Sequence, residues 1–183
     1  MQKFEVPGRG DVSASNQTLF DGLQKAVGFV PNLYATMAYS ENGLATLLQL
    51  QNAKTSLSKK EKELVNLVVS QVNGCRYCQS AHTTIGKMNG FSDEQLIDVR
   101  LNKPSLDNKL NALVKFTREA TQNRGKVSAT TIDTLFAAGY SKENLVDILV
   151  AIGDKTIMNL LHNITQIAID FPVAPELHEA VPA

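Results

Sequence analysis

Apolar residues recur at the three- to four-residue spacing of an α-helix along most of the chain, from about Ser15 onward. The breaks between these segments carry helix caps instead of hairpin turns. Ser58 with Glu61, and Ser92 with Gln95, fit the capping box, in which each side chain binds the backbone N–H of the other residue. Because side chains in a strand alternate every two residues, an apolar period near 3.6 predicts an all-α fold.

The periodic segments predict nine helices joined by short loops. They are expected near residues 15–27, 32–39, 41–54, 58–73, 75–89, 92–101, 106–123, 128–138 and 141–169. Glycine adopts a left-handed backbone most easily, and four glycines stand where a helix should end: Gly74, Gly90, Gly125 and Gly139. The two ends, 1–14 and 171–183, contain most of the prolines and little periodicity. We expect them to be arms on the surface of the domain or on a neighbouring subunit.

Length and charge limit the organisation and the partners. The 183 residues, 43% of them hydrophobic, are enough for one sizeable core, so we expect a single domain over 1–183. Lys and Arg balance Asp and Glu at 18 each, which provides no basic field for nucleic acid or an anionic membrane. The chain shows neither a signal-peptide pattern at its start nor an apolar run of ~20 residues, so we expect a cytoplasmic protein without a membrane partner.

A partial internal repeat joins two helix–glycine–cap–helix turns. Residues 90–99 match residues 139–148, with most differences conservative. Shared capping rules and a true duplication both explain the match, and the sequence leaves both open. The second copy contains no cysteine, so any redox chemistry belongs to the first copy alone.

The chain contains only two cysteines, Cys75 and Cys78, at the expected start of the 75–89 helix, and His82 follows one turn later. At about 100° per residue the three side chains share one narrow face. A helix N-terminus favours a negative thiolate, and two thiols three residues apart on a helix can close a disulfide. An imidazole one turn from Cys78 can exchange its proton near neutral pH. The pattern predicts a dithiol redox site.

Glu63 lies on the preceding helix, at the margin of its buried arc. A carboxylate drawn into a partly dry site has a raised pKa and carries protons near pH 7. Alternatively, Glu63 belongs to the charged run 59–63, and such runs usually cover a solvated face. Spacing alone leaves both interpretations open.

Zinc binding is the alternative to redox chemistry. Cys75, Cys78 and His82 offer three ligands, and Glu63 or His162 offers a fourth. Structural zinc sites normally take a second Cys or His pair from another segment, and the chain has no such pair. A non-enzymatic zinc-binding or scaffold protein is therefore the second hypothesis.

The last expected helix carries a polar stripe on an otherwise apolar segment. Its members are Lys155, Asn159, His162, Asn163 and Gln166. Solvent exposure explains such a stripe better than a role in the site or in a subunit contact.

Residues 57–97 resemble the alkylhydroperoxidase D-like core of the carboxymuconolactone decarboxylase superfamily. The resemblance rests on Glu63 and on the segment from Val69 to His82, with the pattern E-x(11)-C-x-x-C-x-x-x-H. The flanks, including residues 29–33 and the long last helix, resemble the peroxidase-related branch of that superfamily. The decarboxylases of the superfamily generally lack the cysteine pair, so the resemblance does not favour decarboxylation.

The resemblance implies an all-α bundle that assembles as a homo-trimer or homo-hexamer and acts as an antioxidant thiol oxidoreductase. Such a protein binds no cofactor and reduces a hydroperoxide, or a disulfide of a redox partner protein. An external dithiol of the lipoyl type then restores it. The resemblance also assigns attack to Cys78, resolution to Cys75, and proton relay to Glu63 and His82.

Two points of this implied mechanism depend on this chain's own residues. Tyr77 stands where the best-known member has a histidine, and a phenol with a pKa near ~10 shuttles protons poorly at neutral pH. We therefore expect weaker peroxidase turnover or a protein disulfide as the oxidant. The helix dipole favours Cys75 as the attacking thiol, but it contributes only ~0.3–1 kcal/mol. A partly buried imidazolium from His82 shifts a thiol pKa by more, so the sequence predicts attack by Cys78.

Overall fold

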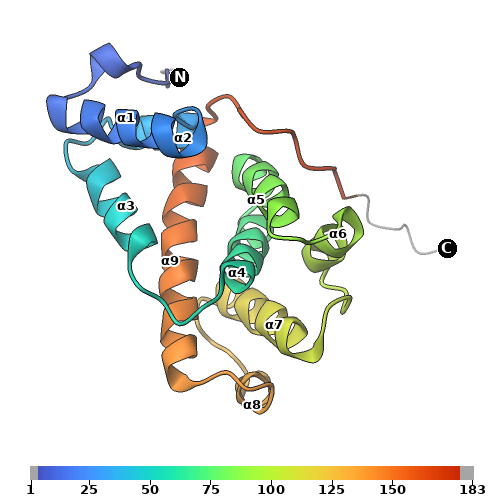
Figure 1. Ribbon diagram of the computed structural model, residues 1–183. Coiled ribbons are helices and arrows are strands. Elements are labelled where there is room, and N and C mark those ends of the chain that lie inside the picture. The colour runs from blue at the N-terminus through green and yellow to red at the C-terminus, as the bar shows by residue number, and fades with distance from the viewer. Residues whose placement is uncertain (1–3, 178–183) are drawn as a thin grey trace.

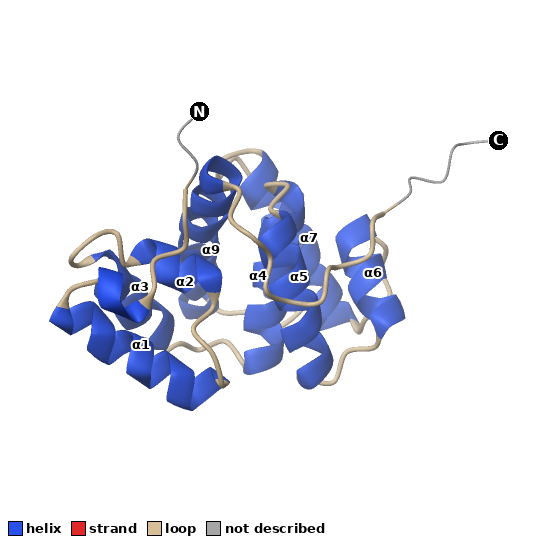
Figure 2. Ribbon diagram, turned by 90° about the horizontal axis from the view of Figure 1, so that it is seen from above, coloured by secondary structure: helices blue, strands red, loops and turns tan. Residues whose placement is uncertain are grey.

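The computed structural model describes residues 4–177, which form a short 3-10 turn, η1 (Arg9–Asp11), and a bundle of α-helices. The helices are α1 (Ala14–Val27), α2 (Asn32–Met37), α3 (Gly43–Asn52), α4 (Lys59–Val72), α5 (Arg76–Met88), α6 (Asp93–Leu101), α7 (Asn108–Gln122), α8 (Ala129–Ala137) and α9 (Lys142–Thr165). The part of the chain between residues 4 and 177 contains no strand, as Figure 2 shows. The all-α prediction is confirmed, and each predicted helix lies within a few residues of its observed bounds.

Local hydrogen bonds at the helix ends explain this agreement. The Ser58 hydroxyl accepts from the Glu61 N–H at 3.2 Å, while the Glu61 carboxylate accepts from the Ser58 N–H at 2.8 Å. Ser92 forms the same capping box at the start of α6. Gly90 and Gly139, in the two copies of the partial repeat, have φ angles of 88° and 94°. Both turns of the repeat therefore use a left-handed glycine followed by a serine cap.

Helix α4 lies at the centre of the molecule and packs against α5, α7 and α9. Five of its apolar side chains are completely buried: Leu64, Val65, Leu67, Val68 and Val69. Burying a side chain of this size stabilises the fold by roughly 1.5–3 kcal/mol. Figure 1 shows α9 running between the α1–α3 group and the α4–α7 group. The central helix thus holds α5 and α9 next to each other.

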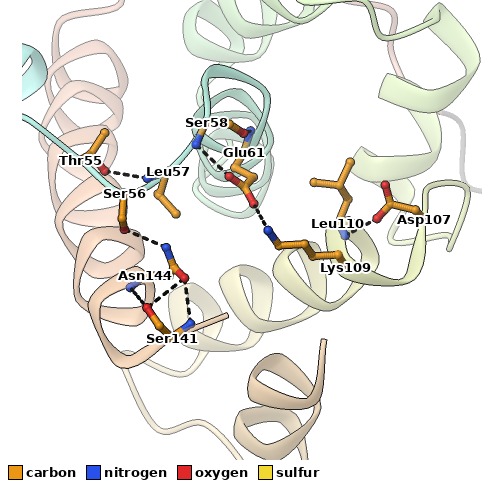
Figure 3. A network of polar contacts seen from close by, with 10 residues as sticks. All are labelled: Thr55, Ser56, Leu57, Ser58, Glu61, Asp107, Lys109, Leu110, Ser141 and Asn144. Carbon is orange, nitrogen blue, oxygen red and sulfur yellow. Dashed lines mark hydrogen bonds and ion pairs between the residues drawn. The ribbon is translucent and has the colours of Figure 1, made fainter. Parts of the chain in front are cut away.

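A polar network fixes the start of α4 relative to α7 and α9 (Figure 3). Asn144 of α9 donates its amide to the Ser56 hydroxyl at 2.8 Å. The Ser56 N–H also donates to Asp147 of α9 at 2.6 Å. On the other side, the Glu61 carboxylate lies 3.3 Å from Lys109 Nζ of α7. These contacts set the relative position of the helices that carry the candidate site.

Residues 166–177 form an extended segment, here called the C-terminal strap, which crosses from α9 over α5 to α6 (Figure 1). Arg76 donates to the Ala174 carbonyl at 2.8 Å, Arg100 donates to the Pro175 carbonyl at 2.8 Å, and the Ala174 N–H donates to Ser80 Oγ at 3.0 Å. The strap therefore has partners within its own domain. Of the two placements expected for the arm from residue 171, its described part takes the one on the surface of its own domain.

The N-terminal arm also lies on its own domain. Arg9 forms an exposed ion pair with Asp21 at 2.8 Å, and the Tyr39 hydroxyl donates to the Glu5 carbonyl at 2.8 Å. Residues 1–3 and 178–183 of the two predicted arms are outside the described residues. No helix within residues 4–177 is both long and apolar enough to cross a membrane.

Candidate active site

The two cysteines lie at the N-terminus of α5, where the sequence predicted them. Cys75 is the N-cap residue, and its sulfur accepts a hydrogen bond from the Cys78 N–H at 3.3 Å. The turn before it is closed by the Cys75 N–H, which donates to the Ser70 carbonyl at 3.0 Å. Both thiols are free and buried, with 0% and 2% of their surface exposed. An N-cap sulfur faces the free N–H groups of the first helical turn, which favour a negative charge.

This arrangement makes the two thiols unequal. The Cys78 side chain, followed by the imidazole of His162 and the Cys78 N–H, lowers the pKa of Cys75 to about 5. The neighbouring Cys75 sulfur and burial raise the pKa of Cys78. One negative charge is thus shared by the pair and rests mainly on Cys75, with Cys78 as the hydrogen-bond donor.

Glu63 and His82 form a pair behind the cysteines. His82 Nδ1 lies 2.7 Å from Glu63 Oε2, and the side chains are 9% and 15% exposed, respectively. Glu63 is therefore paired with a buried residue of α5 and does not belong to a solvated face. Among the described residues, His82 forms no hydrogen bond to either cysteine. The sequence-based prediction that Cys78 attacks assumed a direct contact between His82 and Cys78, and the described part of the structure contains no hydrogen bond between them.

The charge state of this pair differs from the sequence-based expectation. Burial acts to raise the pKa of Glu63, but His82 and Lys155 outweigh it, so the pKa falls below its ordinary value. Burial and Lys155 lower the pKa of His82 despite the Glu63 carboxylate. The expected rise in the Glu63 pKa is wrong, because the hydrogen bond from His82 and the charge of Lys155 outweigh burial. Glu63 is a carboxylate that accepts the Nδ1–H of a neutral His82, and His82 Nε2 remains the basic atom.

Three members of the polar stripe on α9 are buried against the site. Lys155, Asn159 and His162 expose 5%, 0% and 4% of their surface, whereas Asn163 and Gln166 are exposed. Solvent exposure is thus the wrong explanation for the first three. Their spacing of four and three residues puts them on the face of α9 that packs against α4. The sequence did contain a signal for these three site residues: polar side chains spaced three and four residues apart along a long, otherwise apolar helix.

Asn159 is held by two neighbours at the end of α4. Its amide donates to Ser70 Oγ at 3.3 Å, and its carbonyl accepts from Asn73 Nδ2 at 3.0 Å. Ser70 in turn donates to the Asn66 carbonyl at 2.7 Å. The amide also acts on Cys78 and favours its ionised form. Asn159 therefore links α9 to α4 directly beside the cysteine pair.

Lys155 is a buried cation without a direct partner. Within residues 4–177 its ammonium forms neither an ion pair within 4.0 Å nor a hydrogen bond. Burial acts to lower its pKa, but Tyr34, Cys78 and two carboxylates outweigh burial and raise it. Lys155 thus keeps its charge, and this charge favours the thiolate of Cys78.

His162 offers a free nitrogen near Cys75. Its Nε2 lies 3.3 Å from the Ile167 carbonyl, which assigns the proton to Nε2. Nδ1 is buried and has no hydrogen-bond partner among the described residues. The ring packs against Tyr77, with centroids 5.4 Å apart. The imidazole lowers the pKa of Cys75 and so belongs to the site. Sequence analysis offered His162 only as a possible fourth zinc ligand and as a member of the polar stripe.

Tyr77 is buried beside the cysteines and connects α5 to α2 and to the C-terminal strap. Its hydroxyl accepts from the Leu33 N–H of α2 at 3.3 Å, and its ring meets Phe171 of the C-terminal strap edge-on at 5.6 Å. Burial and the neighbouring Asp170 raise the pKa of Tyr77. The neutral ring covers the cysteines together with Phe171. This agrees with the expectation that the phenol does not shuttle protons at neutral pH.

A zinc site requires Cys75, Cys78 and His82 to converge on one point. In the part of the chain from residue 4 to residue 177, no group of three or more His, Cys, Asp or Glu side chains is arranged to hold a metal ion. His82 is turned toward Glu63, and His162 toward the Ile167 carbonyl. The geometry thus gives the zinc hypothesis no ligand set among these residues.

Fold and site together define an all-α protein with a buried helix-capping dithiol. Residues 38–119, which include Glu63, both cysteines and His82, match the carboxymuconolactone decarboxylase family. No curated protein matches the sequence. Together with the resemblance of the 57–97 segment, the match makes residues 38–119 similar to the carboxymuconolactone decarboxylase family.

Solved structures share the fold over nearly the whole chain. An uncharacterized peroxidase-related protein with an alkylhydroperoxidase AhpD core from Ralstonia eutropha superposes with a TM-score of 0.83 at 20% identity, covering 92% of both chains. A peroxidase-related protein from Silicibacter gives 0.78 at 24% identity, covering 90% of both. A cysteine-to-alanine variant of the debrominase Bmp8, in complex with 2,3,4-tribromopyrrole, gives 0.76 at 18% identity, covering 93% of both. At these identities the likeness concerns the fold.

Proposed function

We propose that this protein is a thiol-dependent oxidoreductase that reduces a hydroperoxide, or a disulfide of a partner protein, with the Cys75–Cys78 dithiol. The observation that carries the proposal is the N-cap position of Cys75, whose sulfur accepts the Cys78 N–H at 3.3 Å. The same geometry lowers the pKa of Cys75 to about 5, so a thiolate is present at neutral pH. The thiolate is the nucleophilic form of cysteine.

The chemistry balances with the chain's own two thiols. A thiolate attacks the terminal oxygen of the hydroperoxide, and the O–O bond breaks to give a sulfenic acid and an alkoxide. The alkoxide takes from solvent the proton that the thiol released on ionising and leaves as the alcohol. The resulting sulfenic acid is attacked by the second thiol, which gives up its proton, so that an S–S bond forms and water leaves. With a partner disulfide, two exchange steps give the same Cys75–Cys78 disulfide and a reduced partner. An external dithiol of the lipoyl type restores both thiols by exchange.

The surroundings support Cys75 as the attacking thiol, which reverses the order predicted from the sequence. Cys75 has the N-cap position and the neighbouring His162, whereas Cys78 is the thiol that retains its proton. In this order Cys78 must ionise in the second step. Lys155 and Asn159 favour its thiolate, and His82 Nε2, one turn away, accepts the proton while Glu63 holds the ring. The attack by Cys78 stays a prediction from the sequence, and the single variants described below decide between the two.

The proposal is tested by oxidising the reduced protein with one equivalent of hydrogen peroxide or cumene hydroperoxide under anaerobic conditions. We expect both thiols to disappear together and a Cys75–Cys78 disulfide to appear in the peptide map. Dihydrolipoamide should then restore both thiols and support repeated turnover. The debrominase's ligand, 2,3,4-tribromopyrrole, belongs in the same assay, because a dithiol supplies the same two electrons to a C–Br bond. A protein whose thiols survive every oxidant, including partner disulfides, is not the proposed enzyme.

A further inference from the structure

The outer face of α9 carries an exposed apolar stripe along most of its length. The large side chains Val146, Val150, Ile157, Leu160 and Ile164 are 57%, 44%, 46%, 56% and 63% exposed. With Gly153 between them, these positions follow one another at spacings of 4, 3, 4, 3 and 4 residues. At 100° per residue all six lie within an arc of about 80°. This is the seam of a helix that packs against a second helix.

Gly153 is the second sign of a partner. It lies in the middle of a 24-residue helix, where glycine destabilises by roughly 1 kcal/mol relative to alanine. Nothing within this chain requires glycine here, because a Cβ at this position has no atom within 4 Å. A glycine on an exposed helix face allows the close approach of another helix. The residue thus points to a contact outside this chain.

The seam is complementary to itself in an antiparallel arrangement. When two copies of α9 cross at residue 155, Val146 faces Ile164 of the second copy and Val150 faces its Leu160. Gly153 then faces Ile157, so that the smallest residue of the seam receives a large one. The charged side chains nearest the seam are Lys142, Glu143 and Asp147 at its first turn. In the antiparallel arrangement they face the uncharged positions 168, 167 and 163, so like charges do not meet. A twofold contact of this kind uses the same surface on both copies.

We propose that the outer face of α9 is an interface with a second copy of this chain, packed antiparallel about residue 155. The strip from Val146 to Ile164 measures about 27 Å by 10 Å. A groove of about 720 Å³ lies beside it, between Leu149 and Leu160 of α9 and Ala120 of α7. The strip alone is smaller than the ~800 Å² that each partner of a standard dimer buries, so the contact also has to use the groove.

This interface does not depend on the proposed enzyme activity. Lys155, Asn159 and His162 lie about 180° around α9 from the seam. Two copies would therefore carry their cysteine sites on opposite sides of the paired helices. A twofold contact produces an even number of subunits, so of the two assemblies implied by the family resemblance it allows the hexamer and not the trimer.

The first experiment measures the oligomeric state by size-exclusion chromatography with light scattering. The native protein should contain an even number of subunits, and Leu160→Asp should halve the mass of the assembly or reduce it to a monomer. Met88→Asp is the matched control, because Met88 is 81% exposed on α5 and lies off the seam, and it should keep the native mass. Circular dichroism confirms that both variants are folded. A native trimer or monomer, or an unchanged mass for Leu160→Asp, overturns the interface.

The second experiment tests the antiparallel register by disulfide cross-linking. Val150→Cys and Leu160→Cys are made separately in a protein that also carries Cys75→Ser and Cys78→Ser. On oxidation the mixture of the two should give a cross-linked heterodimer, while each variant alone stays largely uncrosslinked. Cross-linking of each variant with itself indicates parallel helices and refutes the register. Gly153→Leu should weaken assembly at least tenfold, because the leucine fills the space that Ile157 of the second copy occupies. A tighter assembly of this variant also refutes the register.

Discussion

The two halves of the candidate site are built differently. The α5 half contains Cys75, Cys78 and His82 within two helical turns, with Glu63 from the adjacent α4. The α9 half comes from about eighty residues further along the chain and consists of the buried Lys155, Asn159 and His162. The α5 half supplies the sulfur atoms and a carboxylate–imidazole pair. The α9 half supplies a charge, an amide and an imidazole nitrogen.

This difference separates the atoms that react from the groups that set their ionisation. The N-cap geometry of Cys75 is a property of α5 alone, because the Cys78 N–H that it accepts belongs to the same turn. The charge that favours the Cys78 thiolate is on α9. The α5 turn thus favours the negative charge on Cys75, while groups on a distant helix face adjust the ionisation of both thiols.

The largest effects should come from the sulfurs themselves. Cys75→Ser and Cys78→Ser should each reduce turnover by at least ~10³-fold, because the disulfide can no longer form. After one equivalent of peroxide, Cys78→Ser should accumulate a sulfenic acid on Cys75 that dimedone traps, while Cys75→Ser reacts slowly. Faster trapping on Cys78 in the Cys75→Ser protein would support the order predicted from the sequence instead.

Removing the carboxylate–imidazole pair should have the next largest effect. His82→Gln should slow turnover by about 10²-fold, the typical contribution of general acid–base catalysis, because Cys78 loses its proton acceptor. Glu63→Gln should have a smaller effect in the same step, since the ring remains but loses its charged partner at 2.7 Å. Rapid-quench measurements should place both effects in disulfide closure. Equal slowing of the first attack contradicts this assignment.

Lys155→Met should slow disulfide closure by roughly tenfold, the effect of about one pKa unit on the ionisation of Cys78. Formation of the sulfenic acid on Cys75 should continue, so dimedone should trap it even though Cys78 is present. Lys155→Arg retains the positive charge and serves as the matched control. If Lys155→Met closes the disulfide at the native rate, the cation has no role in ionising Cys78.

The smallest effect concerns His162 and is visible in the pH profile. Because the thiolate is the reactive form, alkylation of Cys75 should be constant at neutral pH and should fall as the pH drops through about 5. In His162→Gln the pH midpoint of Cys75 alkylation should rise by about one pH unit, which barely changes the alkylation rate at pH 7. His82→Gln is the control and should leave the midpoint of Cys75 unchanged. An unchanged midpoint in His162→Gln removes this residue from the site.

The helices and the α5 half were predictable from the sequence because they depend on interactions between residues close together in the chain. Capping boxes span three residues, left-handed glycines end helices locally, and the Cys75–Cys78 spacing needs only one turn of helix. The segment around Glu63 and the cysteines also resembles a family with these residues. Sequence reasoning therefore identified all four residues of the α5 half.

The tertiary structure alone decided which face of α9 meets the cysteines and how the site is charged. A helical wheel shows that Lys155 and His162 share a face, but only packing against α4 turns that face inward. The direction of the Glu63 pKa depends on His82 and Lys155, which lie 19 and 92 residues away in the chain. Electrostatic interactions depend on distance in space and on burial, and neither quantity is contained in a local sequence pattern. The sequence thus determined the position of the two sulfurs of the candidate site, and the fold determined the charged and polar groups around them.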